Sequence, residues 1–141
     1  MRSLRQESGF SLIELLIVVV IIGIIAAVAV PALQKGIRAA ENGNTFASMR
    51  TIASTQMSFY TQNNRFGRLN EINDVLSQSL GSVSGSSIVH GKFTYDMAPA
   101  NPTDADLRNG YTITATRNVT GEGVIYKYEI SQAGDIRQIL P

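Results

Sequence analysis

The stretch GFSLIELLIVVVIIGIIAAVAVPAL, residues 9–33, decides the architecture of this chain. Leu, Ile, Val and Ala make up most of it, and Glu14 is its one charged residue. A helix over residues 10–33 would span roughly 36 Å, enough to cross a hydrocarbon core of about 30 Å. A carboxylate at the centre of a bilayer costs about 2.5–3.5 kcal/mol. Glu14 therefore requires either an oppositely charged partner or a function.

The residues before the apolar segment indicate its orientation. Residues 1–9 read MRSLRQESG and include Arg2 and Arg5. Basic residues at this position favour a cytoplasmic N-terminus, with the chain beyond Lys35 on the other side of the membrane. A secretory signal has an apolar core of only about 7–15 residues and a small-residue cleavage site after it. Residues 10–33 do not fit that pattern, so a plain single-span anchor is the simplest alternative.

The order of residues around Gly9 carries a resemblance to a known family. A short basic leader precedes Gly9 and Phe10, and Glu14 follows four residues later inside the apolar run. This pattern resembles the prepilin signature of type IV pilins and type II secretion pseudopilins. The resemblance is close over residues 1–33. It is a general pattern over residues 34–63 and only architectural beyond.

The resemblance implies a processing step. A membrane peptidase of that family would cut between Gly9 and Phe10 and methylate the new amine of Phe10. That amine and Glu14 would have opposite charges, and a hydrogen-bonded pair recovers much of what each ion loses on leaving water. The pair could be internal, because residues four apart share a helix face. We favour a pair between neighbouring subunits, because an internal pair gives no reason to assemble.

Three other positions have a role implied by the resemblance and a simpler alternative. The peptidase is expected to need the small Gly9, although this residue could merely start the helix. Gly23 and Pro31 fall where the family commonly has helix-loosening residues. Gly costs about 1 kcal/mol and Pro about 3 kcal/mol in a helix interior, and Pro31 cannot donate to the carbonyl of Ala27. The alternative is an ordinary kinked membrane helix.

Residues 34–63 continue as an amphipathic helix. Their apolar side chains fall in one arc of the helical wheel, which predicts a face that covers a sheet. We expect one helix from about Phe10 to about Thr61, ended by Gln62, Asn63 and Asn64. The expected head-packing stripe consists of Phe46, Met49, Ile52, Ala53, Met57, Phe59 and Tyr60.

Residues 64–141 predict a small head that begins with a connecting loop. A short helix is expected over residues 70–80, capped by Asn70 or Asn73, and a flexible segment over residues 81–87. Alternating apolar and polar residues predict about four antiparallel strands, with a loop over residues 98–110. The expected strands are Lys92–Met97, Tyr111–Arg117, Val124–Ser131 and Asp135–Leu140. The fold class is α+β: a long N-terminal helix, half membrane-spanning and half amphipathic, packed on a small antiparallel sheet, as in pilins.

Composition argues against nucleic-acid binding, metal or cofactor sites and catalysis. The formal net charge is +1, which favours no nucleic-acid partner, and the chain has no cysteine. No cofactor and no metal are expected, because Asp104 and Asp106 are the only close acid pair and calcium needs six to eight oxygens. His90 is assigned to packing or solvation, and Arg65 and Arg68 to the surface. No nucleophile motif supports an enzyme.

The sequence therefore predicts a structural subunit of a type IV pilus-like helical filament, assembled through its N-terminal helix. Its segments would be a leader (1–9), a filament-core helix (10–33), an amphipathic helix (34–63) and a head (64–141). Its partners would be further copies of itself, prepilin peptidase and the pilus or secretion assembly machinery. It would occupy the inner membrane before assembly, and an extracellular pilus or periplasmic pseudopilus afterwards. The alternative is a minor pilin or pseudopilin that binds DNA, a surface or a secreted substrate at a filament tip.

Overall fold

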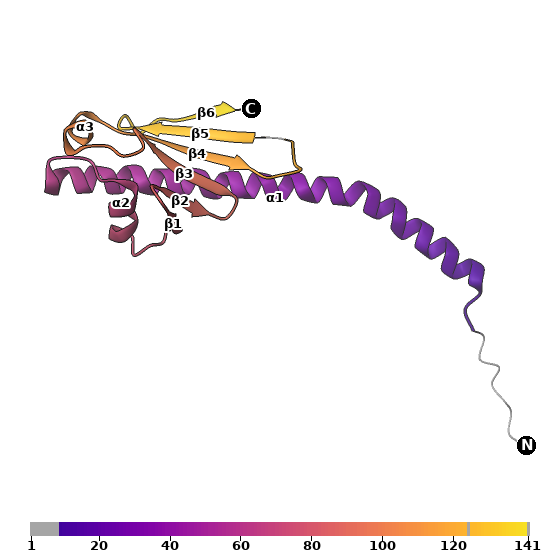
Figure 1. Cartoon of the computed structure of the whole chain (residues 1–141). Coiled ribbons are helices and arrows are strands. Elements are labelled where there is room, and N and C mark those ends of the chain that lie inside the picture. The colour runs from indigo at the N-terminus through magenta and orange to yellow at the C-terminus, as the bar shows by residue number, and fades with distance from the viewer. Residues whose placement is uncertain (1–8, 124, 141) are drawn as a thin grey trace, which may run out of the picture. The chain divides into compact units, whose positions relative to one another are not determined.

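The computed structural model of this chain describes residues 9–123 and 125–140. The chain divides into two compact units: Met1–Ala40, called here the helical unit, and Glu41–Pro141, called the head unit. Most of the expected leader, residues 1–8, lies outside the described residues (Figure 1).

The first element is a helix of 52 residues, α1, which runs from Leu12 to Asn63. It ends as the polar residues 62–64 predict. Asn64 adopts a left-handed conformation with φ 57°, and its backbone N–H donates to the carbonyl of Tyr60 at 2.8 Å. Asn tolerates this conformation better than most residues, which makes it a suitable stop.

The described part of the head unit contains one antiparallel sheet of six strands in the order β1-β2-β3-β4-β5-β6. The four strands expected from alternation are present as β3 to β6, although Val124, the first residue of the third expected strand, lies outside the described residues. Opposite residues on their inner face form a buried row in which Tyr95 pairs with Ala115 and Ala115 with Tyr128. The strands are β1 (Ser82–Ser84), β2 (Ser87–His90), β3 (Phe93–Ala98), β4 (Thr112–Asn118), β5 (Ile125–Ser131) and β6 (Ile136–Leu140).

Strands β1 and β2 correct the expected flexible segment over residues 81–87. They form a hairpin in which Val83 pairs with Ile88, and Gly85 at the turn has φ 64°. Ile88 is 1% exposed, and burial of this one side chain against the core offsets the low strand propensity of the serines around it. His90 is the last residue of β2.

Helix α2 covers Leu69–Val75 and is shorter than expected. Ser77 and Gln78 have positive φ values, so the helix cannot reach Leu80. Neither expected cap residue starts it. The Glu71 carboxylate accepts from the backbone N–H of Arg68 at 2.8 Å, while the buried Asn73 accepts from the backbone N–H of Leu80.

Helix α3, Asp104–Asn109, lies within the expected loop over residues 98–110. A reciprocal capping pair starts it. Asp106 accepts from the backbone N–H of Thr103 at 2.9 Å, and the Thr103 hydroxyl accepts from the backbone N–H of Asp106 at 3.3 Å. The hydrogen bonds from Thr103 lower the pKa of Asp106. These two side chains accept from backbone N–H groups that would otherwise have no partner at the helix start, so the six-residue helix forms despite the prolines before it.

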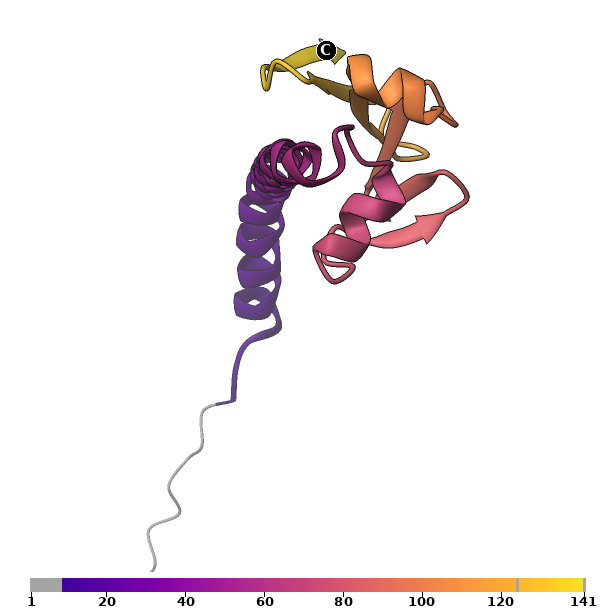
Figure 2. The ribbon, with the colours of Figure 1, turned by 90° about the vertical axis from the view of Figure 1, so that its left-hand side faces the viewer.

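The core of the head unit lies between the second half of α1 and the inner face of the sheet (Figures 1 and 2). Figure 2 also shows α2 beside the β1–β2 hairpin. Met49 and Ile52 from the expected stripe are buried, at 0% and 1% exposure. The partly buried members that pack against this core are Phe46, Ala53, Phe59 and Tyr60.

Met57 departs from the expected stripe, because its side chain is 58% exposed. The neighbouring Gln56 takes the inward position instead and is fully buried. Its amide donates to the carbonyl of Gly67 and accepts from the backbone N–H of Gly67, both at 2.7 Å. The connector after α1 would otherwise leave these two backbone groups unpaired in the core.

A buried cation joins α1 to the sheet inside the head unit. The Arg117 side chain on β4 is 0% exposed and pairs with Glu122 at 2.6 Å and Glu41 at 3.0 Å. Lys92 lies 3.2 Å from Glu41, so two cations face two carboxylates. Hydrogen bonds to Glu122 and then to Glu41 raise the pKa of Arg117. Arg117 was predicted only as the end of a strand, and no local sequence pattern indicates this cluster.

Candidate assembly site

The expected cleavage and assembly residues lie at the start of α1. Gly9, Phe10 and Ser11 precede the helix, and the Ser11 carbonyl accepts from the backbone N–H groups of Glu14 at 3.1 Å and Leu15 at 3.2 Å. Glu14 therefore lies in the first helical turn. A carboxylate there interacts favourably with the helix dipole, typically by about 0.3–1 kcal/mol. The helix start thus tolerates this charge.

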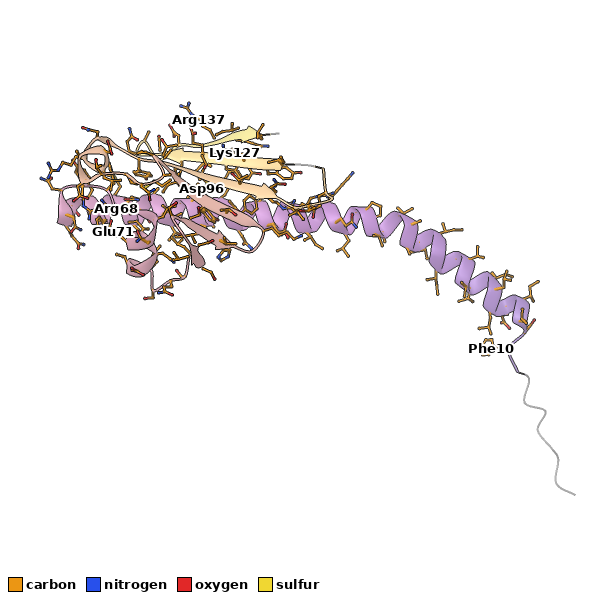
Figure 3. All side chains as sticks on the ribbon, viewed as in Figure 1. Phe10, Arg68, Glu71, Asp96, Lys127 and Arg137 are labelled. Carbon is orange, nitrogen blue, oxygen red and sulfur yellow. The ribbon has the colours of Figure 1, made fainter. Side chains whose placement is uncertain are left out.

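Gly9 and Phe10 are open to the surroundings. Phe10 is 80% exposed, and a Cβ added at Gly9 would meet no heavy atom within 4 Å (Figure 3 labels Phe10). No packing within the described residues requires glycine at position 9. If a small residue is required at position 9, the requirement comes from another molecule. A peptidase that cuts the Gly9–Phe10 bond would be such a molecule.

The helical unit presents an apolar surface on every side. Side chains project all round this part of α1, and none of residues 9–40 is buried (Figure 3). Among the described residues, α1 is the one helix long and apolar enough to cross a membrane. Exposed apolar surface of this extent is typical of a segment covered by lipid or by other protein. Its large exposed members include Leu12, Ile13, Leu15, Leu16, Ile17, Val18, Val19, Val20, Ile21, Ile22, Ile24, Ile25, Val28, Val30 and Leu33.

Gly23 and Pro31 both lie inside α1, which continues through them. A Cβ at Gly23 would meet no heavy atom within 4 Å, so packing inside the chain does not require glycine there. Their expected effect, local loosening of the helix, stays a prediction.

Glu14 is exposed, and within the described residues no ion pair includes it. Both pairings considered for it, internal and between copies, involve the amine that cleavage before Phe10 would create. The structure describes the uncleaved chain, so the choice between them also stays a prediction.

The charged residues of the connector are paired inside the head unit. Arg65 donates to both oxygens of Glu71, at 2.9 and 2.7 Å, and lies 5.3 Å from the centre of the Phe59 ring. Arg68 pairs with Asp104 at 2.7 Å. The hydrogen bond from the Arg65 side chain, followed by the hydrogen bond from the backbone N–H of Arg68, lowers the pKa of Glu71 to about 2. Arg65 and Arg68 thus link α2 to α3, a role that sequence analysis did not predict.

The remaining chemical candidates also have structural partners. Asp104 pairs with Arg68, and Asp106 caps α3. Among the described residues no group of three or more His, Cys, Asp or Glu could hold a metal ion. His90 has its Nδ1 3.0 Å from the carbonyl of Leu80, and a carbonyl only accepts, so Nδ1 carries the proton in this contact.

Comparisons with known proteins agree with this geometry. The family model described as "Prokaryotic N-terminal methylation motif" matches residues 4–30. The "Type IV major pilin protein PilA" of Myxococcus xanthus is 38% identical over 43% of this chain and 28% of its own length. A "Fimbrial protein" of Moraxella nonliquefaciens is 34% identical over 73% of this chain and 62% of its own length.

A third relative is the "Type IV major pilin protein PilE1" of Neisseria gonorrhoeae, 30% identical over 82% of this chain and 55% of its own length. The chain thus spans less than two thirds of the length of each of these relatives. No solved structure matches the chain.

The long apolar helix and the antiparallel sheet define an α+β protein with a pilin-like fold. Together with the methylation motif and the pilin relatives, they support a place for this chain in the type IV pilin family.

Proposed function

We propose that this chain is a structural subunit of a type IV pilus-like helical filament. The observation that carries the proposal is the wholly exposed apolar helix of residues 12–33 with Glu14 in its first turn. A folded head unit with its own core does not need this surface. A filament subunit does need this apolar surface, because packed copies of the helix would bury it.

In this proposal, prepilin peptidase cuts between Gly9 and Phe10 and methylates the amine of Phe10. Before assembly the chain crosses the inner membrane once, with its N-terminus in the cytoplasm. During assembly the Phe10 amine of one copy pairs with Glu14 of its neighbour, which sets the axial register. The exposure of both residues supports this contact between copies. The two charges are then neutralised inside an apolar filament core.

The function is tested with Glu14→Val in cells of the source organism. The variant should insert and be processed but should not enter filaments, because the amine of the neighbouring copy would lack its partner. Gly9→Leu should fail one step earlier and leave an unprocessed band on a gel. Glu129→Val, on the outer face of β5, is the matched control and should assemble normally. Normal filament yield from Glu14→Val would contradict the proposal.

Abundance tests whether the chain forms the shaft. A shaft subunit should dominate the protein sheared from cells, and its deletion should remove the filaments. A scarce subunit whose deletion leaves filaments intact would overturn the shaft role and would favour a minor subunit at the tip.

A further inference from the structure

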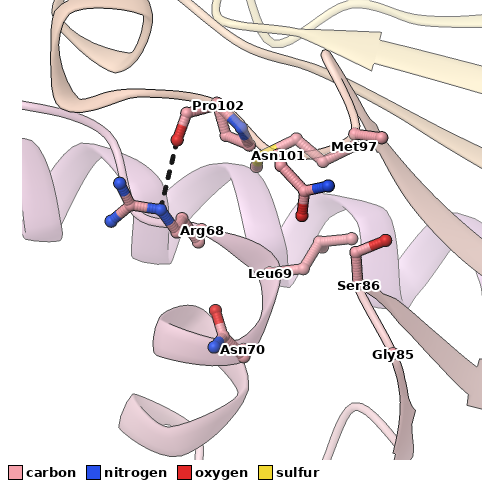
Figure 4. Close-up of a pocket in the computed structure, with 9 residues that line it drawn as sticks. Arg68, Leu69, Asn70, Gly85, Ser86, Met97, Asn101 and Pro102 are labelled. Carbon is pink, nitrogen blue, oxygen red and sulfur yellow. Dashed lines mark hydrogen bonds between the residues drawn. The ribbon is translucent and has the colours of Figure 1, made fainter.

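A small cavity opens on the head unit at some distance in sequence from the assembly residues. It has a volume of about 210 Å³ and lies where the start of α2, the β1–β2 turn and the loop after β3 meet (Figure 4). Liquid water takes about 30 Å³ per molecule, so the cavity holds several waters or one ring-sized ligand.

The walls of this cavity are tied to one another. The Arg68 guanidinium donates to the Pro102 carbonyl at 3.2 Å, which joins the start of α2 to the loop after β3 (Figure 4). It also donates to Asp104 in α3 at 2.7 Å. On the other side, the Ser87 hydroxyl donates to Asp96, which fixes the end of the β1–β2 turn to β3. A cavity held by cross-links of this kind loses little freedom when a ligand enters.

The floor and the rim of the cavity differ in chemistry. Leu69 and Met97 line it with apolar side chains that are 2% and 6% exposed. Asn70, Ser86 and Asn101 contribute polar groups at the rim. In the part of the chain that the structure describes, the Asn101 amide and the Ser86 hydroxyl have no hydrogen-bond partner, and Asn70 uses only its Oδ1, towards the backbone of Glu71.

The charges select the ligand class. Among the described residues that line the cavity, Arg68 is the one charged residue, and Asp104 neutralises it at 2.7 Å. A free anion would have to compete with Asp104, and a cation would face the guanidinium. Amide and hydroxyl groups above an apolar floor fit an uncharged ring that carries hydroxyls on its edge and C–H groups on its face.

We propose that this cavity binds one uncharged sugar residue. Asn101 and Ser86 would exchange hydrogen bonds with its hydroxyls, and Leu69 and Met97 would contact its face. With so few polar contacts, the Kd would be on the order of 1 mM or weaker. The site does not depend on the filament role, so either proposal can fail without the other.

The test is a titration of the ¹⁵N-labelled full chain in dodecylphosphocholine micelles, which contain no sugar. The probes are N-acetyl-D-glucosamine and the methyl α-glycosides of D-glucose and D-galactose. At least one should produce saturable shifts of the side-chain amides of Asn70 and Asn101 and of the backbone amide of Ser86. Any saturable shifts confined to other parts of the chain would overturn the proposal.

Variants establish that the signal comes from this cavity. Asn101→Ala and Ser86→Ala replace exposed residues and should leave the fold intact. Each should weaken binding, Asn101→Ala by about tenfold, which corresponds to about 1.4 kcal/mol. Gln138→Ala, on the exposed edge strand β6, is the matched control and should bind as the parent does.

Two further titrations separate a glycan end from a free sugar and test whether the cavity binds an anion instead. The free hexoses are titrated beside the glycosides: equal binding of both indicates the end of a glycan, and binding of the free form alone indicates a free sugar. Inorganic phosphate is the charged probe. No saturable shift with any sugar, unchanged binding by Asn101→Ala, or a response to phosphate alone would each overturn the proposal.

Discussion

The same residue type has opposite environments in the two units of this chain. Ile21 and Ile24 in the helical unit are 51% and 63% exposed, whereas Ile52 and Ile113 in the head unit are 1% and 0% exposed. Apolar surface buried in the head unit stabilises the fold of the chain itself. Apolar surface on the helical unit does not stabilise the fold of the chain, because it is exposed. It can become buried only through contacts with lipid or with other copies. One helix, α1, thus contributes to folding over its second half and is available for assembly over its first.

The largest expected effect concerns the buried cation of the head unit. Arg117→Ala would leave the carboxylates of Glu41 and Glu122 without their main partner, and loss of one member of a buried ion pair typically costs about 3–5 kcal/mol. Urea unfolding of the full chain in micelles measures this, followed by tyrosine fluorescence, since all five tyrosines lie in the head unit. Arg137→Ala on exposed β6 should cost less than about 0.5 kcal/mol. Equal losses for the two variants would contradict the role of Arg117.

A matched pair of isoleucines tests the comparison itself. Ile113→Ala removes a fully buried side chain and should destabilise the head unit by about 2–5 kcal/mol. Ile21→Ala, exposed in the helical unit, should change the stability of the head unit by less than about 0.5 kcal/mol. The same unfolding measurement gives both values. A loss for Ile21→Ala as large as that for Ile113→Ala would show that the two units are not separate in the way described.

The smallest effect is a pH dependence of the head unit. The pKa of Glu71 is lowered from 4.5 to about 2, mainly by its hydrogen bond from Arg65, so the pair stabilises the fold above about pH 4.5. This contribution should be lost as the pH falls towards 2, because the unfolded chain takes up the proton first. Thermal unfolding of the parent and of Glu71→Gln should therefore differ at pH 7 and converge near pH 2. A difference that stays constant across that range would contradict this assignment.

Much of this fold could be predicted because its signals are local. The apolar run of residues 10–33 and the alternation along β3, β4 and β5 each follow from side chains a few positions apart. The polar residues after Tyr60 predicted the end of α1 for the same reason. The expected assembly residues Gly9, Phe10 and Glu14 also come from a short motif, and their roles in processing and assembly stay predictions.

What could not be predicted depends on contacts distant in sequence. Glu41 and Arg117 are 76 positions apart, and no local pattern indicates that they meet. Likewise, Gln56 displaces Met57 from the core only because the backbone of Gly67 needs partners there. Helix α3 did leave a local signal, since Thr103 and Asp106 have the spacing of a capping box, but the prolines before them favoured a loop. The number of strands was underestimated, at about four instead of six, because the serine-rich strands β1 and β2 resemble a linker in sequence.

Cross-linking within filaments tests the central claim, that the exposed apolar helix contacts other copies. The chain has no cysteine, so single cysteines at Leu15, Leu16, Ile17 and Val18 cover one full helical turn without side reactions. With a short bis-maleimide, at least one of these variants should form dimers in intact filaments, and the cysteine-free parent should not. Filaments that assemble normally while none of the four positions cross-links would contradict the account.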